Sequence, residues 1–182
     1  LNLIYLSLPN GEAQKFINSK CILRGNPIRE SINNGSREDG LKSFGLNTER
    51  LTLLIFGGSQ GSYFINSIVK MAINELKKLN IQIIWQTGPL HFNDFSNYEC
   101  ETVKVVPFIE NMADAYAVSD LVIARSGAIT CSELTYCGKP SILFPFKAAA
   151  GDHQSKNAMA LSQKGAALVL DRKSTRLNSS HQ

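Results

Sequence analysis

The chain has 182 residues, of which 43% are hydrophobic, and its formal net charge is +4 at pH 7. Residues 171–182 carry three basic side chains and one acidic side chain, so without them the charge falls to +2. A charge this small does not predict a nucleic-acid partner. No apolar run approaches the roughly 18 residues of a membrane span. The four cysteines form no Cys-x-x-Cys pair, so no zinc site is predicted and reduced thiols are expected.

Both ends of the chain depart from ordinary protein patterns. The chain starts at Leu1, inside an apolar run and without an initiator methionine. At the other end, residues 171–182 replace an apolar strand with a polar run that resembles a translated sequencing adapter. These residues are left out of the fold prediction, as a cloning scar would be. We therefore expect an internal fragment without its native ends, and a genuine basic tail is the alternative for residues 171–182.

The first 50 residues predict little regular structure. Residues 3–6 and 21–23 are predicted to form short strands around a polar turn and a short helix. Residues 25–29 (Gly-Asn-Pro-Ile-Arg) then break the apolar pattern. Residues 30–49 are polar, with Asn-Asn-Gly-Ser at 33–36, and are predicted to form a linker or surface loop.

From residue 51 the chain alternates between short apolar runs and amphipathic segments. The runs predict strands at residues 51–56, 81–86, 102–106, 121–124, 141–144 and 166–170. Helices are predicted along the apolar stripe from Ile65 to Leu79, over residues 111–118, from Thr130 to about 138, and over 154–164. This alternation is typical of an α/β fold with a parallel sheet and helices on both faces. Ligands of such sheets bind beyond the carboxyl ends of the strands, which is where the loops after Phe56, Ala124 and Phe144 are expected.

Residues 125–133 (Arg-Ser-Gly-Ala-Ile-Thr-Cys-Ser-Glu) follow one of these strands and open a helix. Gly127 allows close backbone approach to a ligand, and the first N–H groups of a helix can bind an anion. Glu133 could then bind the paired hydroxyls of a ribose, which would suit a nucleotide-sugar site. The alternative is structural: Thr130 and Glu133 have the spacing of a capping box, in which each side chain satisfies a backbone N–H group.

Residues 57–61 (Gly-Gly-Ser-Gln-Gly) could hold a phosphate on backbone N–H groups at the start of the next helix. The segment matches neither the dinucleotide fingerprint nor the P-loop, and a tight turn capped by Ser59 or Ser62 is the alternative. No Asp-x-Asp pair occurs, so a diphosphate would be neutralised by helix N-termini and a cation such as Arg29 rather than by a metal ion.

Residues 151–157 begin the last predicted helix with a polar segment. Gln154 and Asn157 lie one helical turn apart, and their amides can both donate to and accept from the hydroxyls and acetamide of a sugar. Capping by Asp152 is the alternative explanation for this polarity. His153 lies beside Asp152, but no nucleophile accompanies them, so a catalytic pair is not predicted.

Five stretches carry a family resemblance: residues 25–29, 57–61, 107–112, 125–133 and 152–158. In this order they resemble the MurG family, the N-acetylglucosaminyl transferases of peptidoglycan synthesis in glycosyltransferase family 28. The resemblance covers most of the chain between residues 21 and 170. It implies the Rossmann-like C-terminal half of a GT-B enzyme, with residues 1–29 as the end of the acceptor domain and the linker. Residues 30–170 would be the truncated UDP-GlcNAc-binding domain.

The resemblance also implies roles for individual residues. Arg29 and Ser59 would contact the diphosphate, Ile109 would read uracil through its backbone, and Glu133 would bind ribose. It implies no metal ion, no cofactor and no catalytic residue in this part of the enzyme, because the general base would lie in the other domain. The donor-binding residues implied are Arg29, Ser59, Ile109, Ala128, Ile129, Thr130, Glu133, Gln154 and Asn157.

The activity implied is an inverting transfer of GlcNAc from UDP-GlcNAc to undecaprenyl-pyrophosphoryl-MurNAc-pentapeptide. The enzyme would contact the cytoplasmic face of the inner membrane peripherally and would bind no nucleic acid. This chain alone is expected to be inactive. A stand-alone UDP-GlcNAc-binding subunit of a split glycosyltransferase, an epimerase acting on the donor, and a nucleotide-binding domain without transfer activity are the alternatives.

Overall fold

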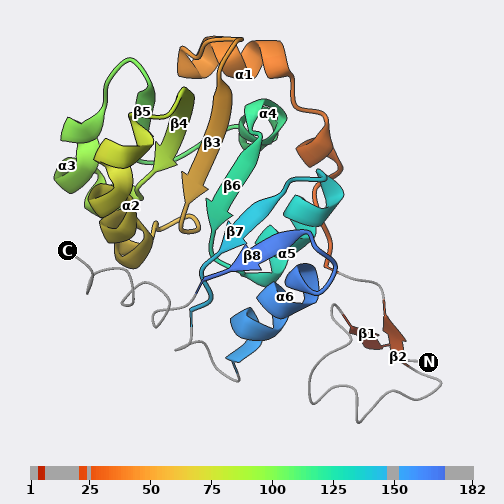
Figure 1. The fold of residues 1–182 in the computed structure, drawn as a ribbon. Helices are drawn as coiled ribbons and strands as arrows, with labels where there is room; N and C mark the ends of the chain where they lie inside the picture. The colour runs from red at the N-terminus through yellow and green to blue at the C-terminus, as the bar shows by residue number, and fades with distance from the viewer. Residues whose placement is uncertain (1–3, 7–20, 24–25, 147–151, 171–182) are drawn as a thin grey trace.

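The computed structural model describes residues 4–6, 21–23, 26–146 and 152–170 (Figure 1). Its centre is a six-stranded sheet in the order β5-β4-β3-β6-β7-β8, in which every neighbouring pair is parallel. The predicted parallel α/β fold is therefore confirmed. The strands are β3 (Leu51–Phe56), β4 (Ile81–Gln86), β5 (Val103–Val106), β6 (Leu121–Ala124), β7 (Ser141–Leu143) and β8 (Ala167–Val169).

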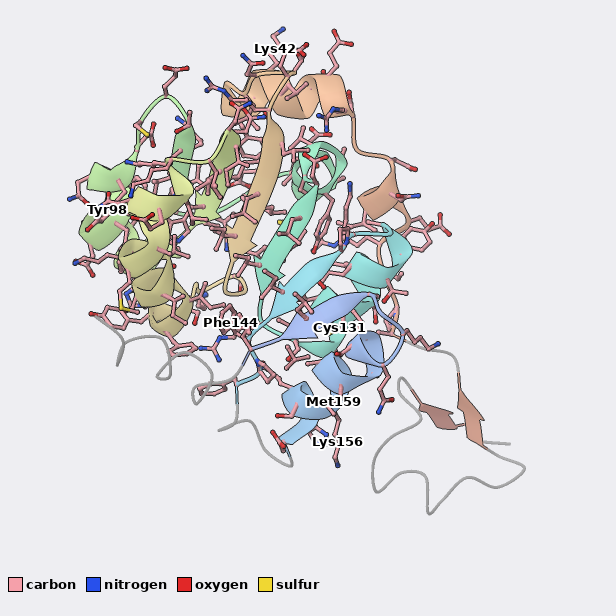
Figure 2. The ribbon with its side chains drawn as sticks, viewed as in Figure 1. Lys42, Tyr98, Cys131, Phe144, Lys156 and Met159 are labelled. Carbon is pink, nitrogen blue, oxygen red and sulfur yellow. The ribbon has the colours of Figure 1, made fainter. Side chains whose placement is uncertain are left out.

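Helices cover both faces of this sheet and create two apolar cores (Figure 1). One core packs α2 and α3 against the sheet, and the other packs α4, α5 and α6 against the opposite face, with α1 lying on α4. Figure 2 shows Cys131 of α5 and Phe144, which belong to different cores. The helices are α1 (Arg37–Phe44), α2 (Tyr63–Leu76), α3 (Phe92–Phe95), α4 (Met112–Val118), α5 (Ala128–Tyr136) and α6 (His153–Ser162).

The central strands are mostly apolar because both of their faces are covered, and the polar residues within them (Thr52, Gln82 and Gln86) are buried. Successive side chains of a strand point to opposite faces, so Leu54 and Ile84 lie in the core with α4 whereas Ile55 and Trp85 lie in the core with α2. All four side chains are fully buried. A strand with one polar face could not fill both cores.

Residues 30–49 are not the loop that the sequence predicted. They contain a 3-10 helix (Glu30–Asn33) and the eight-residue helix α1. The N–H of Asp39 donates to the Ser36 hydroxyl at the start of α1, and Gly45 ends the helix with a φ of 64°. These are ordinary helix caps, but the helix between them buries so little apolar surface that no apolar stripe revealed it.

Smaller differences concern connections and ends. Between β4 and β5 the chain forms a 3-10 helix (Pro89–His91), α3 and a second 3-10 helix (Ser96–Tyr98), none of which was predicted. Strands β1 (Ile4–Leu6) and β2 (Cys21–Leu23) pair in parallel. The turn and helix predicted between them, and the adapter-like residues 171–182, lie outside the described residues.

Candidate functional site

A cavity of about 630 Å³ opens at the carboxyl edge of the sheet, beside the last residues of β3 and β4. The loop after Phe56 contributes Gly58 and Ser59, and helix α5, which follows the loop after Ala124, contributes Ile129, Thr130 and Glu133. The third loop expected there follows Phe144 and includes residues 147–151, which lie outside the described residues. The cavity is lined by Arg29, Ser31, Ile32, Phe56, Gly58, Ser59, Gln86, Phe108, Ile109, Glu110, Asn111, Met112, Ala113, Ile129, Thr130 and Glu133.

Six of the nine predicted donor-binding residues line this cavity, although they come from four separate segments of the chain. Between the segment before α1 and the one that opens α5 lie about a hundred residues of sequence, so the fold and not proximity in sequence brings them together. The six are Arg29, Ser59, Ile109, Ile129, Thr130 and Glu133.

The remaining three predicted residues do not line the cavity. Ala128 is the first residue of α5, directly before Ile129. Gln154 and Asn157 belong to α6 and bind the loop that leads into α5: the Ser126 hydroxyl donates to the Gln154 carbonyl (2.8 Å), and Asn157 Nδ2 donates to the Ser126 carbonyl (3.0 Å). The Gln154 side chain also accepts from the N–H of Phe146 (2.9 Å). Sugar binding by Gln154 and Asn157 therefore stays a prediction.

The start of α5 decides between the two interpretations of Glu133. The helix begins at Ala128 with Gly127 as its N-cap, and no side chain caps it. Thr130 lies in the first turn, too late to act as the cap, so the capping-box interpretation is wrong. The predicted start of this helix at Thr130 was two residues late for the same reason. The first N–H groups of α5 have no partner within the helix and lie beside the cavity.

The Glu133 carboxylate instead accepts a hydrogen bond from the Tyr116 hydroxyl of α4 (3.1 Å). Tyr116 is a buried residue of α4 and packs edge-on against Phe56. Burial of the hydroxyl, together with the negative charge of Glu133, raises the pKa of Tyr116 well above its usual value. Tyr116 thus remains a donor and holds the carboxylate in one orientation within the cavity.

Stability is expected to fall above about pH 10 because of Tyr116. In the unfolded chain this tyrosine ionises near pH 10, whereas in the folded chain its raised pKa keeps it protonated. The unfolded state then binds fewer protons, so the free energy of unfolding decreases by about 1.4 kcal/mol for each pH unit above 10. Urea unfolding of the native chain and of Tyr116→Phe, compared at neutral and alkaline pH, tests this. Equal alkaline losses in both proteins would contradict it.

The loop at residues 57–61 leaves Ser59 open to the cavity. Ser62, not Ser59, caps α2, because its hydroxyl accepts from the N–H of Ile65 (3.3 Å). Arg125, the residue after β6, donates to the same hydroxyl through Nε (3.1 Å) and Nη2 (2.7 Å). The turn alternative is thus correct for Ser62, while the exposed Ser59 is free of a capping role.

Sequence reasoning missed several residues that line the cavity, and Gln86 is the most consequential of them. It is the last residue of β4 and only 3% exposed. Its Nε2 donates to the Gly58 carbonyl (2.9 Å), and its Oε1 accepts from the N–H of Ile109 (3.0 Å). A polar residue at the carboxyl end of a mostly apolar strand was the available signal.

The described part of the chain offers neither a metal site nor a membrane span. Within residues 26–146 and 152–170, no group of three or more His, Cys, Asp or Glu side chains could hold a metal ion. Among the described helices, none is long and apolar enough to cross a bilayer.

Comparison with known proteins assigns the chain to a family. The profile of the glycosyltransferase family 28 C-terminal domain matches residues 52–180. The UDP-N-acetylglucosamine--N-acetylmuramyl-(pentapeptide) pyrophosphoryl-undecaprenol N-acetylglucosamine transferase of Cytophaga hutchinsonii is 42% identical over 157 residues, which cover 85% of this chain and 42% of that protein. The enzyme of the same name from Flavobacterium psychrophilum is 42% identical over 160 residues, or 86% of this chain and 44% of that protein.

A solved structure agrees with the sequence relatives. The crystal structure of Acinetobacter baumannii MurG is 26% identical and has a TM-score of 0.64, covering 91% of this chain and 50% of the other. The chain thus spans about half the length, or slightly less, of the relatives it matches. Sequence profile, relatives and fold agree, and the chain belongs to glycosyltransferase family 28, with the Rossmann-like C-terminal domain of a GT-B glycosyltransferase.

Proposed function

We propose that this chain supplies the donor site of an enzyme that transfers GlcNAc from UDP-GlcNAc to undecaprenyl-pyrophosphoryl-MurNAc-pentapeptide. The observation that carries the proposal is the cavity at the carboxyl edge, where the oriented carboxylate of Glu133 lies beside the N-terminus of α5. A carboxylate suits two ribose hydroxyls, and helix N–H groups suit a phosphate. The names of relatives about 40% identical to this chain supply the sugar and the acceptor.

In and beside this cavity each part of the donor has a proposed partner. Glu133 binds the ribose, and Ser59 and Arg29 bind the diphosphate together with the N–H groups of Ala128, Ile129 and Thr130 at the start of α5. The N–H of Ile109 is already bonded to Gln86, so uracil meets the carbonyl oxygen of Ile109, which can accept from the imide N–H of the base. Gln154 and Asn157 are proposed to reach the GlcNAc hydroxyls from the start of α6.

The proposed chemistry needs no metal ion. UDP leaves with negative charge that the positive end of α5 and the Arg29 guanidinium stabilise. The base that activates the acceptor hydroxyl would come from the other half of the enzyme. Residues 1–29 are proposed to be the end of that half and the linker. The whole enzyme would act at the cytoplasmic face of the inner membrane through peripheral contact, without a nucleic-acid partner.

A graft tests this proposal. Residues 30–170 replace the matching segment of the Cytophaga hutchinsonii relative, and transfer of labelled GlcNAc from UDP-GlcNAc to the lipid-linked MurNAc-pentapeptide is measured. We expect activity in the graft and its loss when the graft also carries Glu133→Gln. A folded graft that binds UDP-GlcNAc but transfers nothing would contradict the proposed reaction. It would favour the alternative, a donor-binding subunit that needs a different partner chain.

A further inference from the structure

The side chain of Gln86 joins two loops that face the cavity from opposite sides of one strand. In the sheet, β4 lies between β3 and β5, and Gln86 stands at its carboxyl end. One end of the Gln86 amide binds Gly58 in the loop after β3, and the other binds Ile109 in the loop after β5.

The two bonds fix the orientation of the Gln86 amide without ambiguity. The Gly58 carbonyl requires a donor and the Ile109 N–H requires an acceptor, so Nε2 and Oε1 cannot exchange places. The Gly58 carbonyl also accepts from the N–H of Gly61 (2.9 Å). Because a peptide unit is planar, a fixed Gly58 carbonyl fixes the N–H of Ser59 in the same unit. In the same way, the bonded N–H of Ile109 fixes the peptide between Phe108 and Ile109.

We infer that Gln86 is a positioning residue for the nucleotide-sugar donor, which sets the phosphate-binding and base-binding loops in one geometry before the donor arrives. The inference rests on the proposed function. Gln86 acts through Ser59 and Ile109, which flank the cavity at its diphosphate and uracil ends, and its own amide is occupied by the two loops. Loops that are ordered in advance do not lose that freedom on binding, which strengthens affinity.

The test compares Gln86→Met and Gln86→Glu with the native 182-residue chain by calorimetric titration with UDP-GlcNAc. Met keeps the volume but makes neither bond, so binding is expected to weaken about tenfold. The Gln86→Glu carboxylate cannot donate to Gly58 near pH 8, but once protonated it can both donate and accept. Its deficit relative to the native chain should therefore shrink as the pH falls toward 5.5, whereas the Gln86→Met deficit should stay constant.

Gln82 provides the matched control. It lies on the same face of β4, four residues earlier, is 2% exposed, and makes four hydrogen bonds at the opposite edge of the sheet, including those to Thr52 and Asn47. Gln82→Met should lower the free energy of unfolding without weakening UDP-GlcNAc binding. A purely structural role for Gln86 would instead make both Met variants alike in stability and in affinity.

The outcomes separate this inference from the proposed function. A native chain that does not bind UDP-GlcNAc would overturn both. Native binding with unchanged affinity in Gln86→Met, or a Gln86→Glu deficit that does not respond to pH, would overturn the positioning role alone. Native binding with a tenfold weaker Gln86→Met and a pH-rescued Gln86→Glu would support it.

Discussion

Replacing Glu133 with Gln is expected to weaken UDP-GlcNAc binding by about 10- to 100-fold, since hydrogen bonds to a charged group contribute about 1.5–3 kcal/mol. The substitution keeps the size of the side chain and removes its charge. An amide also exposes N–H groups where the carboxylate offers two acceptor oxygens. The Tyr116 hydroxyl, which donates to that carboxylate, can still bond the amide oxygen, so the fold should persist. Calorimetric titration of the chain with UDP-GlcNAc measures the effect.

Two further variants test whether the loss of UDP-GlcNAc affinity in Glu133→Gln comes from the charge of this carboxylate. Tyr116→Phe leaves the charge of Glu133 in place but frees its orientation, so a smaller loss of affinity is expected than from Glu133→Gln. Glu38→Gln removes a carboxylate from the exposed part of α1 and should leave binding unchanged. If Glu133→Gln binds the donor as tightly as Glu38→Gln does, the carboxylate does not contact the ribose.

The sheet could be predicted from the sequence because the apolar composition of its strands indicates that they are buried. The predicted bounds of β3, β4 and β6 agree with the structure. Each of these strands lies between two covered faces, so each is a mostly apolar run that ends where the chain reaches the carboxyl edge. Knowing which loops share that edge was then enough to place Ser59 and Glu133 at one cavity.

Helix α1 could not be predicted in this way, because its capping residues mark it and an apolar stripe does not. Gly40 is buried, and Leu41 and Phe44 pack half-buried against the core, so the apolar stripe of α1 is too short to mark the helix. Ser36 and Gly45 cap it in ordinary ways, but in a polar segment such residues predict turns equally well. The start of α5 was misplaced for a related reason. Its N-cap is Gly127, which uses no side chain, while the sequence offered Thr130 as a more usual cap.

Local sequence patterns could not show how Arg29 reaches the cavity, which only the family resemblance implied, and they could not show the role of Gln86. Arg29 reaches the cavity only because the segment before α1 packs against α4, and a contact between such distant segments leaves no local pattern. Gln86 is the last residue of β4 and differs from the preceding Trp85 in its polarity. Its role depends on hydrogen bonds to Gly58 and Ile109, which belong to the loops after two other strands.

Substituting Gly61 with Ala should destabilise the fold by at least about 3 kcal/mol, because backbone strain and a steric clash act together. Gly61 has a φ of 77°, and a Cβ there would lie 2.0 Å from the Thr87 carbonyl oxygen. The contact is reciprocal, since a Cβ on Gly88 would lie 2.2 Å from the Gln60 carbonyl oxygen. The loops after β3 and β4 thus meet backbone to backbone, and neither has a flexible side chain that could move aside. Urea unfolding measures the loss.

The variant Gly165→Ala serves as the control that distinguishes the steric clash from the backbone strain. Gly165 has a φ of 71° but open space where a Cβ would lie, so Gly165→Ala should cost only about 1–2 kcal/mol of backbone strain. UDP-GlcNAc binding distinguishes the two variants further. Gly61→Ala must displace the loop that carries Ser59 and should weaken binding, whereas Gly165→Ala lies between α6 and β8, outside the cavity lining, and should not. Equal stability losses in the two variants would mean that the loops after β3 and β4 do not abut. The close approach that holds Ser59 at the cavity would then have to come from Gln86 alone.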